Sequence, residues 1–157
     1  MANPFPDIAE NDLAYIAGFL DGEGTISIIR VKRKDRVRTY KNPYFRPIVV
    51  INNTNREVLE WIAAVFGVGK IDIAHKQTDK RKTCYRWIVG NRVAINIARA
   101  LHPYLRIKRL QAEILFEYEE ASTSDVNPYG SLGIPSNIID TRNSLVDRLR
   151  VENQRGS

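Results

Sequence analysis

The sequence contains few of the residues from which several common protein sites are built. It has one cysteine, Cys84, and only two histidines, His75 and His102, in 157 residues. A single cysteine excludes an internal disulfide and a cysteine zinc site, and the histidines have no ligand-spaced partners. No pattern typical of a serine or cysteine triad is present. Hydrolytic chemistry in this chain would therefore have to use another nucleophile, for which water held by a metal ion is the natural candidate.

Long apolar runs are also missing. No run approaches the roughly 18 residues of a membrane span, and the N-terminus lacks a basic segment followed by an apolar one. We therefore expect an intracellular protein of the cytoplasm, nucleoid or an organelle matrix, with no membrane partner. Apolar residues still make up 43% of the chain, enough for one domain with a core. The net charge of +6 favours a polyanionic partner, nucleic acid before an anionic membrane.

The stretch from Leu13 to Gly24, LAYIAGFLDGEG, carries the most information. Its apolar spacing predicts a short helix up to Leu20, with Asn11 or Asp12 as N-cap and with Gly22 and Gly24 ending it. Glu23 would then lie at a helix C-terminus, where backbone carbonyls concentrate partial negative charge. A carboxylate in that place is unfavourable unless a cation binds.

The same helix has a face of small residues, Ala14, Ala17 and Gly18. Such a face lets a second helix approach closely, and two copies would bring two Glu23 carboxylates together. A cluster of oxygens suits Mg²⁺, which takes carboxylates, waters and phosphate oxygens. A plainer interpretation is a buried amphipathic helix followed by solvated turn acids. A calcium loop fits poorly, because Ile26 and Lys32 stand where that loop needs glycine and glutamate.

Residues Ile16 to Gly24, IAGFLDGEG, resemble the signature nonamer of the LAGLIDADG homing endonucleases. The resemblance implies that motif helices form the subunit interface, through Ala14, Ala17, Gly18 and Asp21. It also implies that Glu23 and Gly22 hold the catalytic Mg²⁺, with Mn²⁺ tolerated and no small-molecule cofactor. Because the chain has one motif, a homodimer acting on a long, near-palindromic double-stranded DNA target is expected. The resemblance further implies an intron-encoded gene.

Residues 25–38 and 44–53 are predicted to form a hairpin. Ile26 and Ile28 share the parity of the basic residues of its first strand, which indicates either a bulge near Ile28 and Ile29 or a change of environment. Five basic residues at alternate positions would share one face and are predicted to contact DNA, although a solvated face is the plain alternative: Arg30, Lys32, Lys34, Arg36 and Arg38.

The rest of the chain predicts further elements in a repeating order. A capping box at Thr54 opens a helix to Phe66, and a second hairpin covers 70–77 and 82–89. Asn91 is predicted to cap a third helix, and a fourth spans 107–121. The hairpin adds predicted DNA contacts at Lys70, Lys76, Lys82 and Arg86.

This order resembles the α+β LAGLIDADG core, αββαββα, with a curved four-stranded antiparallel sheet. We expect residues 1–121 to form that core and 122–157 to add a loop and a C-terminal helix that begins near Ser136.

Two further catalytic residues follow from the resemblance. Asn52, or Asn53 after a one-residue shift, matches a polar residue that positions water or metal. Lys108, within PYLRIKRLQ, matches a basic residue that polarises the nucleophile or stabilises charge. The expected function is metal-dependent, site-specific cleavage of double-stranded DNA. The alternative is a non-cleaving DNA-binding regulator or an RNA intron maturase of the same fold.

Overall fold

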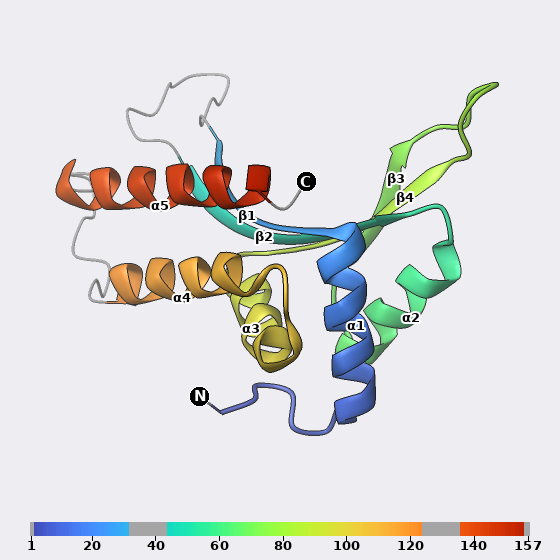
Figure 1. Cartoon of the computed structure of the whole chain (residues 1–157), viewed down its shortest axis with the longest axis horizontal. Coiled ribbons are helices and arrows are strands. Elements are labelled where there is room, and N and C mark those ends of the chain that lie inside the picture. The colour runs from blue at the N-terminus through green and yellow to red at the C-terminus, as the bar shows by residue number, and fades with distance from the viewer. Residues whose placement is uncertain (1, 32–43, 124–135, 156–157) are drawn as a thin grey trace, which may run out of the picture.

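The computed structural model describes residues 2–31, 44–123 and 136–155. Within these ranges the elements follow the predicted order of helix, hairpin, helix, hairpin, helix and helix (Figure 1). The strands form one four-stranded antiparallel sheet, so the predicted α+β class is confirmed. In this part of the chain, no helix is both long enough and apolar enough to cross a membrane.

The first helix, α1 (Glu10–Glu23), extends at both ends beyond the prediction. It begins after Ala9, which makes no side-chain cap, so the predicted capping by Asn11 or Asp12 is wrong. Its last turn includes Gly22, which was predicted to end the helix. The low helix propensity of glycine led to a predicted end that is too early, because a glycine is tolerated in a helix when the surrounding structure supports it.

Gly24 is where helix changes to strand, as predicted. A Cβ at this position would lie 2.2 Å from Leu20 Cδ1 and 2.9 Å from the carbonyl oxygen of Val50. A glycine is therefore required for α1 to enter the sheet this close to its neighbour.

The sheet has the strand order β1-β2-β4-β3. Its strands are β1 (Gly24–Val31), β2 (Tyr44–Asn53), β3 (Lys70–His75) and β4 (Cys84–Gly90). The pairing of β1 with β2 runs without a break from Gly24 opposite Ile51 to Val31 opposite Tyr44. No bulge forms at Ile28, so the change of environment is the correct explanation of the β1 pattern.

The two faces of the sheet differ in burial. One face packs on the helices and includes Ile26, Ile28, Val49, Ile51 and Trp87, which are all nearly inaccessible. Because side chains alternate along a strand, the residues between them point the other way. We call that side the open face, and its described members include Thr25, Ser27, Ile29, Val31, Tyr44, Arg46, Ile48, Val50, Asn52, Lys70, Asp72, Arg86 and Ile88.

Two helices begin one residue away from the predicted caps. α2 (Arg56–Phe66) is capped by Asn55, whose Oδ1 accepts the backbone N–H of Val58 at 3.2 Å, rather than by Thr54. α3 (Asn91–Leu101) follows Gly90. The Asn91 side chain instead accepts the Tyr44 hydroxyl at 2.8 Å.

Gly67 ends α2 in the left-handed conformation. Trp61 of the same helix is 37% exposed and lies edge-on to Tyr15 of α1.

After a short 3₁₀ turn, η1 (His102–Tyr104), the chain continues into α4 (Arg109–Thr123). Ile114 and Leu115 are buried, whereas Ile107 and Leu110 are 58% and 54% exposed. The helix predicted to begin at residue 107 begins at Arg109, so Ile107 precedes it. The predicted core boundary at residue 121 falls within α4.

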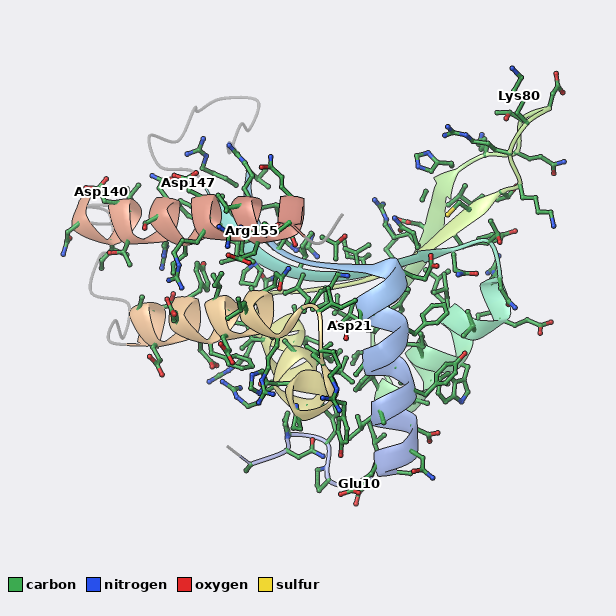
Figure 2. The ribbon with its side chains drawn as sticks, in the orientation of Figure 1. Glu10, Asp21, Lys80, Asp140, Asp147 and Arg155 are labelled. Carbon is green, nitrogen blue, oxygen red and sulfur yellow. The ribbon has the colours of Figure 1, made fainter. Side chains whose placement is uncertain are left out.

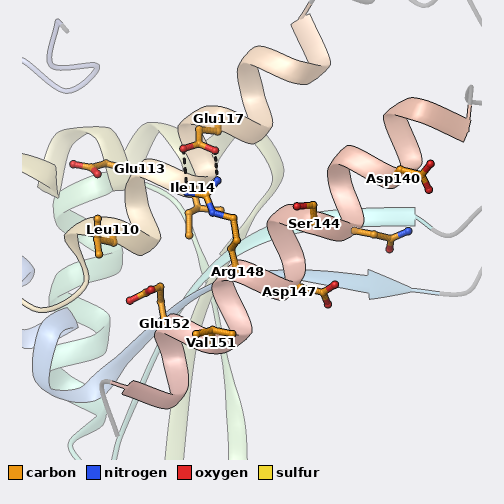
Figure 3. A pocket seen from close by; sticks show the side chains of 11 residues that line it. Leu110, Glu113, Ile114, Glu117, Asp140, Ser144, Asp147, Arg148, Val151 and Glu152 are labelled. Carbon is orange, nitrogen blue, oxygen red and sulfur yellow. Dashed lines mark hydrogen bonds and ion pairs between the residues drawn. The ribbon is translucent and has the colours of Figure 1, made fainter.

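The last helix, α5 (Ser136–Arg155), lies beside α4 and along the free edge of β1 (Figure 1). Asn153 Nδ2 donates to the carbonyl oxygen of Ile26 at 3.2 Å, which satisfies part of that edge. Arg142 of α5 is half-buried over the rings of Phe45 and Tyr118. Between α4 and α5 lies a shallow groove, bridged by the ion pair of Arg148 with Glu117 (Figure 3).

Candidate active site and nucleic-acid interface

The C-terminal end of α1 is open to solvent and carries negative charge. Glu23, the last helical residue, and Gly22 are both exposed, and no heavy atom lies within 4 Å of a Cβ placed on Gly22. The last turn of α1 contains no basic residue of its own. The helix end therefore concentrates carbonyl dipoles and a carboxylate in one place.

A positively charged side chain at this end of α1, Lys108, comes from a distant part of the sequence. Lys108 Nζ donates a hydrogen bond to the carbonyl oxygen of Asp21. Burial lowers the pKa of the Lys108 ammonium, and the Asp21 carboxylate partly opposes that shift. Lys108 consequently loses its proton at a lower pH than an ordinary surface lysine, which suits a group that takes part in proton transfer.

Asp21 fastens the end of α1 to the start of α4. Its carboxylate is buried, with 8% exposure, and accepts the backbone N–H groups of Arg106, Ile107 and Lys108 at 2.7, 3.1 and 2.9 Å. These donors precede α4 directly, so the carboxylate serves as an N-terminal anchor for that helix. Figure 2 labels Asp21 at this junction. Asp21 was predicted to face a second subunit, but its carboxylate is engaged within its own chain.

Asn52 lies next to the same junction. It occupies the open face at the end of β2 and is exposed, with Arg86 of β4 opposite it. The neighbouring residue Ile51 pairs with Gly24, which directly follows Glu23. The alternative, Asn53, uses its Oδ1 to accept the N–H of Asn55 at 2.7 Å in the turn before α2. The fold therefore brings the segments that carry Glu23, Lys108 and Asn52 to the C-terminal end of α1, and Asn52 remains the candidate.

The small residues of α1 divide between two environments. Ala14 and Gly18 are exposed, and no heavy atom lies within 4 Å of a Cβ placed on Gly18. Ala17, predicted to share their face, is fully buried in the core of its own chain. The free stripe on α1 is thus Ala14, Gly18 and Gly22, at a spacing of one helical turn.

The predicted basic face of the first hairpin is only partly described. Lys32, Lys34, Arg36 and Arg38 lie outside the described residues. Arg30 pairs with Phe45, shares the helix side of β1 with Ile28, and donates to Asn143 of α5 at 2.8 Å. Alternation places Arg30 on the same side of β1 as the buried Ile26 and Ile28, as their shared parity predicted, and this side faces α5 rather than the open face.

Other basic residues occupy the open face or extend from it. Lys70 and Arg86 lie on the open face, and the exposed Lys76 and Lys82 lie beyond the ends of β3 and β4. Sequence reasoning missed Arg46, whose guanidinium lies on the open face over Gly90. Its parity with Asn52 in the same predicted strand was the signal that could have found it.

The donors at the end of α1 fit a hard divalent cation. A carboxylate and backbone carbonyls are oxygen ligands of the kind that Mg²⁺ prefers. Among the described residues of one chain, however, no group of three or more acidic, histidine or cysteine side chains gathers at one point. A single chain thus offers Glu23 and neighbouring carbonyls, which form part of a metal site.

Comparison with known proteins gives a family and a relative for this chain. A model of the LAGLIDADG endonuclease family matches residues 16–119. The chain is also similar to the reverse gyrase of Thermococcus kodakarensis, with 30% identity over 110 residues. That match covers 69% of this chain and 6% of the reverse gyrase, so the chain spans a small part of that relative.

Solved structures with a similar fold include three homing endonucleases. I-CvuI in complex with the I-CreI target gives a TM-score of 0.70 at 20% identity, over 91% of this chain and 82% of that chain. The archaeal intron-encoded I-Vdi141I complexed with DNA gives 0.67 at 23% identity, over 91% and 84%. I-TnaI gives 0.65 at 14% identity, over 92% and 97%.

Proposed function

Because the chain belongs to the LAGLIDADG endonuclease family, we propose that it is a site-specific homing endonuclease that hydrolyses both strands of a long, near-palindromic DNA duplex. The proposal is supported chiefly by the end of α1, where Glu23 is the last residue, Lys108 donates to the Asp21 carbonyl, and the strand end carrying Asn52 pairs with Gly24 through Ile51. These groups stand beside an open sheet face with basic residues, which can follow a DNA groove. The similar proteins I-CvuI and I-Vdi141I are described in complex with DNA, which supports the same substrate class.

The proposal places the active site between two copies of the chain. The exposed stripe of Ala14, Gly18 and Gly22 would let two α1 helices pack closely, with both Glu23 carboxylates at one end of the pair. The resulting site would be symmetric, so each subunit would read one half of the target.

The chain's own residues have distinct roles in this proposal. Glu23, with the carbonyls near Gly22, would hold Mg²⁺, which when bound supplies charge neutralisation at the phosphate and increases the acidity of water. The Lys108 ammonium, held by the Asp21 carbonyl, would stabilise negative charge that develops on the phosphate oxygens. Asn52 can donate and accept hydrogen bonds and would orient the attacking water.

The direct test is cleavage of a duplex that joins the sequences flanking the insertion carrying the gene. We expect cutting of both strands with Mg²⁺ and none with EDTA, read on a sequencing gel. Tight duplex binding without cutting in Mg²⁺ would contradict the proposed chemistry and favour a regulator. Preference for the structured insertion RNA over the duplex would favour a maturase.

The dimer is tested separately by Gly18→Leu. Inside one chain the new side chain meets open space, and replacing a helical glycine is itself favourable by about 0.5–1 kcal/mol, so the monomer should stay folded. Across a close helix pair the same side chain would clash. We expect sedimentation to show that Gly18→Leu is a monomer and that the unsubstituted chain is a dimer. Gly18→Leu should also lose double-strand cutting.

Glu57→Leu is the matched control, since it adds the same side chain at an exposed position of α2. It should leave both the oligomeric state and cutting unchanged. A Gly18→Leu protein that remains dimeric would show that α1 does not form the interface.

A further inference from the structure

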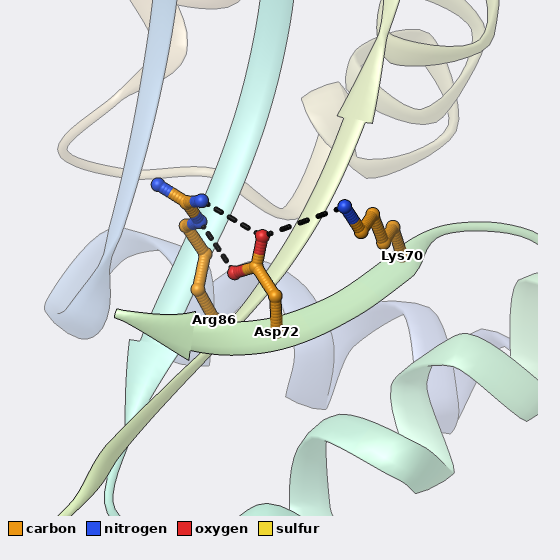
Figure 4. Close-up of polar contacts among 3 residues, drawn as sticks. All are labelled: Lys70, Asp72 and Arg86. Atoms are coloured by element: carbon orange, nitrogen blue, oxygen red, sulfur yellow. Dashed lines mark hydrogen bonds and ion pairs between the residues drawn. The ribbon is translucent and has the colours of Figure 1, made fainter. Parts of the chain in front are cut away.

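An ion pair with two parallel hydrogen bonds stands on the open face of the sheet. Arg86 Nε and Nη2 donate to Asp72 Oδ1 and Oδ2, each at 2.8 Å, and Lys70 Nζ lies 4.0 Å from Oδ2 (Figure 4). Asp72 and Arg86 are direct cross-strand partners on β3 and β4. The hydrogen bond from Arg86 lowers the pKa of the Asp72 carboxyl, so the pair is charged at neutral pH. The arginine plane is thereby fixed in orientation.

The presence of Asp72 on this face needs an explanation. It is the only acidic residue among the described members of the open face. A carboxylate there weakens attraction to phosphates, and an exposed ion pair adds little stability in return. The presence of Asp72 is therefore better explained by its effect on the orientation of the Arg86 guanidinium.

Asp72 leaves one edge of the guanidinium free. Of the five N–H groups, the carboxylate accepts one from Nε and one from Nη2. The Nη1–Nη2 edge keeps two donors side by side, and 40% of the Arg86 side chain is exposed. Guanine alone presents two adjacent acceptors, O6 and N7, in the major groove.

From this geometry we propose that Arg86, oriented by Asp72, reads a guanine in each half of the DNA target. The inference rests on the proposed function and adds a specificity pair to it. Arg86 would contact the base, and Asp72 would act as a positioning residue. Because Asn52 lies opposite Arg86 in the sheet, the guanine would lie in the inner part of each half-site, near the bonds to be cut.

The test is competition binding without divalent metal, with duplexes that carry each base pair in turn at every target position. We expect the parent chain to prefer guanine at one inner position of each half-site by about tenfold or more. In Asp72→Ala the preference at that position should fall to within about threefold. Affinity for the intact target should not fall, because a negative charge has been removed.

Asp79→Ala is the matched control. It removes the same charge from the exposed tip of the hairpin, away from Arg86, and should leave every base preference unchanged. Arg86→Ala should abolish the guanine preference and also weaken binding.

The outcomes separate this inference from the proposed function. Unchanged base preference in Asp72→Ala, with or without a lower melting temperature, would show a purely structural ion pair and overturn the inference alone. Absence of any sequence-specific duplex binding by the parent chain would overturn the proposed function and the inference with it.

Discussion

Replacing Glu23 with glutamine is expected to abolish DNA cleavage while DNA binding persists. Glutamine keeps the size of the side chain but loses the negative charge that would hold a divalent cation at the end of α1. Loss of metal assistance worth about 4 kcal/mol corresponds to about a thousandfold in rate. Single-turnover cutting of the flank-joined duplex in Mg²⁺ measures the rate, and fluorescence anisotropy in EDTA measures affinity.

Glu10→Gln provides the control for this experiment. Glu10 lies at the opposite end of the same helix, is exposed, and has the same charge. Both variants raise the net charge equally, so both should bind DNA at least as tightly as the parent chain. Only Glu23→Gln should stop cutting. Cleavage by Glu23→Gln at a rate near that of the parent would remove Glu23 from the metal site.

The order of the elements could be predicted because it depends on local signals. The short β-branched run from Ile48 to Ile51 in 44–53 and helical spacing in 56–66 each indicate one type of element, and Gly67 marks the end of a helix. The nonamer placed Glu23 at a helix C-terminus, where the structure has it. These features depend only on residues close in sequence, so the structure contains them as predicted.

Contacts between distant segments could not be predicted in the same way. The sequence gives no sign that Asp21 anchors residues 106–108, since its partners are backbone groups that any residue carries. Alternation in β1 placed Arg30 with other basic residues, but only the packed structure shows that this side faces α5. Arg46 was missed for a related reason, because which face of a strand stays open is decided by the helices that cover the other.

The Asp21 anchor predicts a large loss of stability in Asp21→Asn. The carboxylate oxygens accept three backbone N–H groups in a buried place, whereas an asparagine amide has one acceptor atom and turns its NH₂ toward a donor. Leaving buried donors unpaired and removing a charged acceptor should lower the free energy of unfolding by about 2–4 kcal/mol. For a domain of this size, that corresponds to a fall in melting temperature of about 4–16 °C.

Urea unfolding should show a lower midpoint with an unchanged slope, because the folded chain stays equally compact. Asp12→Asn is the control: it makes the same change on the same helix, away from α4, and should alter stability by no more than about 1 kcal/mol. Cleavage by Asp21→Asn should fall even at temperatures where the variant is folded, because the Asp21 carboxylate holds the segment that places Lys108 at the end of α1. A variant as stable as the parent would mean that the three N–H groups find other acceptors and that α4 does not depend on Asp21.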